Sequence, residues 1–134
     1  MEKVMKNYKG KVKLAYKFFP LPFHNHAEPA ARAAIAAKNQ GKFWEMHDIL
    51  FANQSKLGPD FFESTAKKLD LDMDKFKADM NSEQTKKIVQ KDIALGRKNG
   101  IQGTPGFFVN GVAVKGAYPY DYFKTIIDRW LKQG

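Results

Sequence analysis

Large apolar residues alternate with polar ones along two short stretches of the chain. Over residues 11–19 every second side chain is large and apolar, and lysines fill most of the positions between them. This alternation predicts a β-strand with one buried face. Residues 107–115 contain two apolar runs on either side of Asn110-Gly111, the residue pair that a type I′ turn requires. We therefore expect a strand over 11–19 and a hairpin over 107–115.

The segment between these stretches, about residues 27–99, has the spacing of amphipathic α-helices. Helices are expected to begin near Glu28, Phe43 and Pro59. A short fourth helix is capped by Asp72 or Asp74, and a longer fifth helix is capped by Asn81 or Ser82 and ends at Gly100. The fifth is expected to turn four apolar side chains inward: Ile88, Val89, Ile93 and Leu95.

Two further helices flank this pattern. A short helical segment over residues 2–8 is stopped by Gly10. The C-terminal segment carries an amphipathic stripe of five residues: Phe123, Ile126, Ile127, Trp130 and Leu131. The predicted order is helix, strand, helical block, hairpin and helix, within one domain that spans residues 1–134.

The complete absence of cysteine restricts the chemistry of this 134-residue chain. It excludes a disulfide framework, a cysteine-ligated zinc ion, an iron–sulfur cluster and a cysteine nucleophile within the chain. No apolar run is long enough for a membrane span, and the N-terminus lacks the apolar region of a signal peptide. We expect a globular domain with no catalytic residue of its own.

The charge is strongly basic, with 23 Lys and Arg against 14 Asp and Glu, a net charge of +9. Such a charge could favour nucleic acid or an anionic membrane surface. However, arginine, which binds phosphate and guanine with two parallel hydrogen bonds, occurs only at Arg32, Arg97 and Arg129. The lysines are typical of solvated helix faces and strand edges, so we expect no nucleic-acid partner.

The histidines and carboxylates do not form a recognisable metal motif. His24 and His26 make a lone H-x-H pair, and His47 lies on the apolar side of its own helix. The acidic residues at 70–74 lack the glycine and the closing glutamate of a calcium loop. No glycine-rich phosphate loop or nucleophile motif occurs either. We expect neither a metal nor a cofactor.

The segment Gly103-Thr104-Pro105 stands at the mouth of the predicted hairpin. Proline after Gly-Thr in a tight turn is compatible with a cis peptide bond, and it is equally compatible with a trans proline that starts a strand. In the cis arrangement the backbone N–H and C=O of Thr104 would be left unpaired. Those groups could then bind an extended peptide as an added strand.

In this order and spacing, several stretches resemble the DsbA-type thiol-disulfide oxidoreductases of the thioredoxin superfamily. They are residues 11–22, 27–31, 41–47 and 100–105, followed by Asn110-Gly111. The resemblance implies an α/β thioredoxin-like fold with a helical subdomain, about residues 27–99, inserted between strand 11–19 and hairpin 107–115. It also implies a cis bond before Pro105 and a peptide substrate bound at Gly103, Thr104 and Pro105.

The sequence departs from this family at its N-terminal end. Family members begin with a strand that leads into C-x-x-C at the start of the first helix, where the thiolate is activated. Here the first strand, the C-x-x-C and most of the first helix are absent, so we expect a fold truncated at its N-terminus. A smaller departure is Gly106, where the family usually carries a side chain such as Thr or Ser.

Two functional interpretations follow. In the first, the chain is a fragment of a DsbA-type oxidoreductase without its redox cysteines and is redox-inactive as written. In the second, it is a cysteine-free module that holds an extended peptide or a protein partner at the loop around Thr104. In both, the incomplete sheet favours a homodimer with strand 11–19 near its interface. The family usually works outside the cytoplasm, but the sequence assigns no compartment to this chain.

Overall fold

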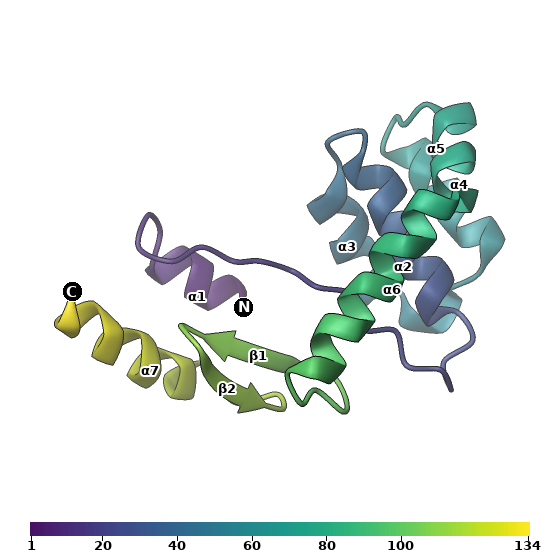
Figure 1. Ribbon diagram of the computed structural model, residues 1–134. Helices are drawn as coiled ribbons and strands as arrows, with labels where there is room; N and C mark the ends of the chain where they lie inside the picture. Colours follow the sequence, from purple (N-terminus) through teal and green to yellow (C-terminus); the bar gives the residue numbers. More distant parts are fainter. The chain divides into compact units, whose positions relative to one another are not determined.

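Two compact units make up the chain in the computed structural model, which describes residues 1–134 (Figure 1). Unit 1 combines Met1–Lys17 with Arg97–Gly134. Unit 2 is Phe18–Gly96 and is therefore inserted in the sequence between the two parts of unit 1. No helix of the chain combines the length and the apolar character that crossing a bilayer requires.

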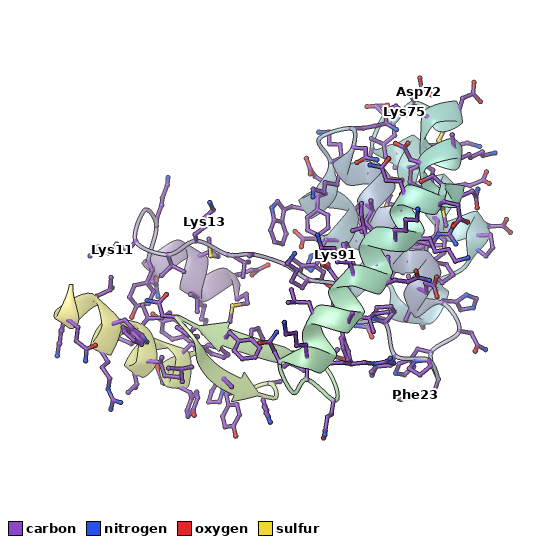
Figure 2. All side chains as sticks on the ribbon, viewed as in Figure 1. Lys11, Lys13, Phe23, Asp72, Lys75 and Lys91 are labelled. Carbon is purple, nitrogen blue, oxygen red and sulfur yellow. The ribbon has the colours of Figure 1, made fainter.

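Unit 2 is helical, as the apolar spacing predicts. Its elements are α2 (Ala27–Lys38), α3 (Phe43–Ala52), the short 3₁₀ helix η1 (Gln54–Lys56), α4 (Pro59–Lys68), α5 (Met73–Asn81) and all but the end of α6 (Glu83–Lys98). The structure also shows which of the predicted residues cap α5 and α6. At the start of α5, the Asp72 carboxylate accepts the backbone N–H of Lys75 at 2.9 Å (Figure 2). Before α6, the Ser82 hydroxyl accepts the backbone N–H of Thr85 at 3.1 Å.

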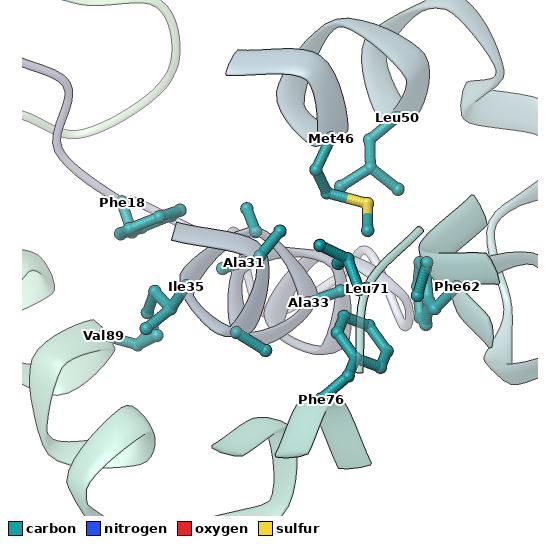
Figure 3. Packing of buried hydrophobic residues seen from close by; sticks show 14 residues of the cluster. Phe18, Ala31, Ala33, Ile35, Met46, Leu50, Phe62, Leu71, Phe76 and Val89 are labelled. Atoms are coloured by element: carbon teal, nitrogen blue, oxygen red, sulfur yellow. The ribbon is translucent and has the colours of Figure 1, made fainter. Parts of the chain in front are cut away.

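The core of unit 2 is built around the alanine-rich helix α2, as Figure 3 shows. Five of its alanines are buried: Ala31, Ala33, Ala34, Ala36 and Ala37. Because a methyl group is small, the neighbouring helices approach α2 closely, and α3, α4 and α5 all contact it. Phe62 of α4 and Phe76 of α5 fill the remaining space and are fully buried. Close packing of this kind makes the core sensitive to changes in volume.

Unit 1 contains α1 (Glu2–Asn7), the hairpin strands β1 (Gly106–Val109) and β2 (Val112–Lys115), and α7 (Tyr120–Gln133). The hairpin is closed by Asn110 and Gly111, whose φ angles of 47° and 85° are those of the predicted type I′ turn. Helices α1 and α7 lie in contact, and their apolar faces form a second core with the hairpin (Figure 1). The buried members of this core are Val4, Tyr8, Val114, Phe123 and Ile127.

The strand predicted over residues 11–19 is wrong, because the sheet consists of β1 and β2 alone. A strand needs a neighbouring backbone to pair with, and alternation of side chains does not supply one. The segment instead contributes to the two cores separately. Val12 packs against the core of unit 1, and Phe18 is buried in the core of unit 2. The backbone N–H of Phe18 donates to Asp92 Oδ2 at 3.0 Å.

The buried faces of α6 and α7 also differ from the prediction. On α6, Val89 is buried and Ile93 packs against the core as predicted, but Ile88 and Leu95 are 38% and 45% exposed. Thr85 and Asp92 are buried on this helix instead. The face is turned because the buried carboxylate of Asp92 accepts the Phe18 N–H, a hydrogen bond that apolar periodicity cannot indicate. On α7, Phe123 and Ile127 are buried, but Trp130 and Leu131 remain exposed.

A polar contact joins α1 to α7. The Tyr8 hydroxyl donates to Asp128 Oδ1 at 2.6 Å, and Lys124 also donates to the Asp128 carboxylate. The hydrogen bonds from Lys124 and from Tyr8 hold the pKa of Asp128 below its ordinary value. The same hydrogen bond to Asp128 raises the pKa of Tyr8 above its ordinary value.

The stability of unit 1 should therefore depend on pH at both extremes. The contribution of Asp128 is present above the carboxyl's unfolded pKa of about 4, and is lost as pH falls through its lowered pKa. The contribution of Tyr8 is present below about pH 10 and is lost as pH rises through its raised pKa. Urea unfolding between about pH 5 and about pH 2.5 should show a shallower loss of stability in Asp128→Asn. Identical pH profiles for the two proteins would contradict this coupling.

Candidate peptide-binding site

Residues Gly103, Thr104 and Pro105 form the loop that joins α6 to β1. All three are exposed, as is Gly106 at the start of β1. The peptide bond between Thr104 and Pro105 is cis. The structure therefore brings the three residues singled out by sequence together at the surface of unit 1.

The hairpin register determines which backbone groups of this segment point outward. Val109 is paired with Val112 across the two-residue turn, and Phe107 is paired with Val114. The Pro105 carbonyl continues the pattern by accepting the Gly116 N–H at 2.9 Å. Odd-numbered residues from 105 to 109 thus bond to β2, and even-numbered residues direct their N–H and C=O groups away from it.

Gly106 and Phe108 therefore present their backbone groups along the outer edge of the hairpin, and Thr104 lies next to the start of that edge. No hydrogen bond within the chain engages the N–H or C=O of Thr104. The sheet contains no third strand to cover this edge. We call these three residues the open edge. Alternating donors and acceptors at an uncovered edge can bind an extended polypeptide by strand addition.

Ile101 explains the glycine at position 106. A Cβ atom added to Gly106 would lie 2.7 Å from Ile101 Cδ1, closer than real Cβ atoms approach other carbons. The Ile101 side chain thus lies across the start of β1 in the space that a threonine or serine side chain would need. This contact could not be found by sequence pattern, because it joins the two ends of an irregular loop.

Substitutions at these two positions should be coupled. Gly106→Ala forces the Ile101 δ-methyl group to move, whereas Ile101→Val removes that methyl group and costs about 0.5–1.5 kcal/mol by itself. The double variant should be more stable than the sum of the single effects by about 0.5 kcal/mol or more. Urea unfolding of the four proteins measures this coupling. Strict additivity would show that the two side chains do not compete for space.

The remaining candidate residues do not assemble into a chemical site. No group of three or more His, Cys, Asp or Glu side chains is arranged to hold a metal ion. His47 lies beside Asp48, with Nδ1 2.9 Å from Oδ1, and packs against the rings of Phe43, Trp44 and Phe51. In the acidic stretch at 70–74, Asp72 serves as the N-cap of α5.

One family model matches almost the whole chain, and the named relatives are of two kinds. The model of the DSBA-like thioredoxin domain family matches residues 1–128. The "Probable disulfide bond formation protein D" of Bacillus cereus is 33% identical over 134 residues, which cover 93% of this chain and 61% of that protein. The "Na(+)/H(+) antiporter NhaA 3" of Salinispora tropica is 39% identical over 108 residues, which cover 80% of this chain and 17% of the antiporter. The chain thus spans only part of the length of these relatives.

Solved structures support the same fold. A thioredoxin-like oxidoreductase from Silicibacter pomeroyi matches with a TM-score of 0.81 and 26% identity, covering 98% of this chain and 75% of that one. The thiol-disulfide exchange protein alpha-DsbA2 from Wolbachia pipientis matches with a TM-score of 0.85 and 19% identity, over 96% of this chain and 70% of that one. The exposed Thr-Pro loop, the inserted helical unit and the match over residues 1–128 identify this cysteine-free chain as a member of the DSBA-like thioredoxin domain family.

Proposed function

We propose that this chain supplies the peptide-binding part of a DsbA-type thiol-disulfide oxidoreductase. The observation that carries the proposal is the open edge, where Thr104, Gly106 and Phe108 offer backbone donors and acceptors in register. An extended segment of a substrate protein would pair with this edge through its own backbone. Binding through backbone groups tolerates many side chains, which suits an enzyme family that acts on varied proteins.

The chemistry of disulfide exchange would have to come from thiols outside this chain. Exchange requires a thiolate that attacks a disulfide and forms a mixed disulfide, and the chain has no cysteine. By itself the chain would bind a substrate segment without oxidising or reducing it. The same absence of thiols favours the alternative function, a binding module that holds an extended peptide or a protein partner at Gly103, Thr104 and Pro105 without redox chemistry.

A titration observed by NMR tests the proposed edge. The ¹⁵N-labelled protein is mixed with a neutral nine-residue peptide of alternating valine and threonine, capped at both ends. The largest amide shifts should fall on Thr104, Gly106 and Phe108. A matched peptide that is N-methylated at alternate residues loses the N–H donors that face the edge. Its affinity should be lower by about tenfold or more. Equal binding of the two peptides, or shifts confined to unit 2, would contradict the proposal.

We also propose that two copies of the chain associate through this edge when no peptide occupies it. A two-stranded sheet is marginally stable by itself, and an uncovered edge invites pairing. Lys13, Leu14 and Ala15 form no backbone hydrogen bond within the chain and could supply a strand to a second copy. Sedimentation should show a dimer that excess peptide converts to monomer. A stable monomer at micromolar concentration without peptide would contradict the homodimer.

A further inference from the structure

The net positive charge belongs entirely to unit 1. This unit contains 12 basic and 3 acidic side chains, whereas unit 2 contains 11 of each. Some charges of unit 2 are also paired, as in the ion pairs Lys75–Asp79 and Lys77–Glu63. A charge confined to one unit produces a local positive potential that attracts anionic partners and accelerates their association.

Little of this charge is neutralised within unit 1. Lys17 has an interaction elsewhere in the chain, and Lys124 pairs with Asp128. The other ten basic side chains of the unit form no ion pair. Lys11 and Lys13 are among them and are exposed (Figure 2). Arg129 of α7 is also exposed, and its guanidinium keeps its hydrogen-bonding capacity for a partner.

Arg129 lines an apolar groove between α7 and β2. The groove has a volume of about 480 Å³. Besides Val112 of β2, it is lined by side chains on successive turns of α7, among them Tyr122, Ile126 and Trp130. Three of the apolar side chains that line it are exposed: Val112 is 41% exposed, Tyr122 43% and Trp130 37%. The Tyr122 ring is held in place by stacking on Tyr118, with ring centroids 4.4 Å apart.

We propose that this groove binds an acidic polypeptide segment that carries large apolar side chains. Carboxylates of the segment would pair with Arg129, whose planar guanidinium can form two parallel hydrogen bonds to one carboxylate. Its apolar side chains would cover Tyr122 and Trp130. Tyrosine, tryptophan and arginine are the residues that most often dominate binding energy at protein interfaces. The net positive charge of unit 1 would select acidic segments over basic ones.

The shape of the groove favours a polypeptide over other anionic partners. The groove is concave and its lining is mostly apolar, so it suits the apolar side chains of a polypeptide. A lipid surface would require exposed apolar side chains on a protruding face. Nucleic acid would require several cations along the groove, whereas Arg129 is the only cation that lines it. This inference does not depend on the open edge, because the groove lies between α7 and β2 and not along β1.

Trp130 itself can report binding. Trp44→Phe leaves Trp130 as the only tryptophan of the chain. The probe is a twelve-residue peptide with leucines on one helical face and glutamates elsewhere, and matched peptides carry glutamine or lysine in place of glutamate. The acidic peptide should shift Trp130 emission to shorter wavelength and should bind about tenfold more tightly than the glutamine peptide at low salt. The lysine peptide should not bind.

Matched charge variants distinguish specific binding at Arg129 from a general effect of the net positive charge. Arg129→Gln should weaken binding of the acidic peptide about tenfold. Lys98→Gln in the same unit and Lys68→Gln in unit 2 remove the same charge and should each change affinity by about threefold or less. Equal effects of Arg129→Gln and Lys98→Gln would overturn the site. A stronger response of Trp130 to anionic phosphatidylglycerol vesicles, or to single-stranded DNA, would overturn the choice of partner.

These outcomes can be distinguished from those of the peptide-edge experiment. The neutral peptide is observed through the amides of Thr104, Gly106 and Phe108, and the acidic peptide through the indole of Trp130. Loss of the first signal with retention of the second would refute the edge and leave the groove. The reverse result would refute the groove.

Discussion

The purified chain is expected to accelerate the reduction of insulin by dithiothreitol no more than an equal amount of a cysteine-free control protein does. The reason is chemical: the reaction proceeds through a thiolate and a mixed disulfide, and the chain has no sulfur atom outside methionine. Insulin turbidity measured over time decides the question. Acceleration by material shown by mass spectrometry to be free of other proteins would contradict the proposal that the exchange chemistry comes from thiols outside this chain.

The complementary expectation is that the chain gains redox activity when a cysteine-containing segment is joined to it. A strand followed by a C-x-x-C segment, the arrangement expected for DsbA-type proteins, would be joined to the N-terminus of this chain. Insulin reduction should then rise clearly above the control, because the active-site thiol would gain a thioredoxin-like domain with a peptide-binding loop. The same fusion with both grafted cysteines changed to serine is the matched control. A folded, cysteine-containing fusion without activity would contradict the proposal that this chain supplies the peptide-binding part of a DsbA-type oxidoreductase.

Phe76→Ala is expected to destabilise the protein by about 3–5 kcal/mol, the largest stability effect that we predict. The Phe76 ring is fully buried in the core of unit 2, and Figure 3 shows it among Leu71 and the alanines of α2. Truncation leaves a cavity, because helices already packed against small side chains have little freedom to close around it.

Urea unfolding observed by circular dichroism measures this loss, and Phe23→Ala is the control within the same unit. The Phe23 side chain is 73% exposed, so its truncation should change stability by about 0.5 kcal/mol or less. A Phe76→Ala variant as stable as the Phe23→Ala variant would show that burial of the Phe76 ring does not stabilise unit 2. Such a result would contradict the packing described here.

The helices and the hairpin were predictable because their signals are local. Apolar residues spaced by one helical turn, a capping side chain at Asp72 or Ser82, and Asn110-Gly111 between two apolar runs each act over a few residues. The loop residues Gly103, Thr104 and Pro105 could also be singled out, because Pro preceded by Gly-Thr at a hairpin is rare enough to notice. Family resemblance then supplied their expected role.

Features that depend on distant partners were not predictable in the same way. The alternation over residues 11–19 has the form of a strand, yet Val12 and Phe18 pack into two different cores. The burial of Asp92 is compensated by a hydrogen bond from the backbone N–H of Phe18, which lies 74 residues earlier in the chain. Position 106 accommodates glycine and not a larger residue because the Ile101 side chain lies across the loop. No local sequence pattern indicates these contacts.

The sequence by itself determined the helical unit, the hairpin, the loop at Thr104 and the absence of a thiol. Each follows from side-chain spacing, backbone preference or composition, which are properties of neighbouring residues. Only the tertiary structure decided that the backbone of Thr104, Gly106 and Phe108 forms an open edge, and that Arg129 lies beside exposed aromatic rings. Strand pairing and packing join residues that are far apart in the chain, so their outcome depends on which partners are present in space.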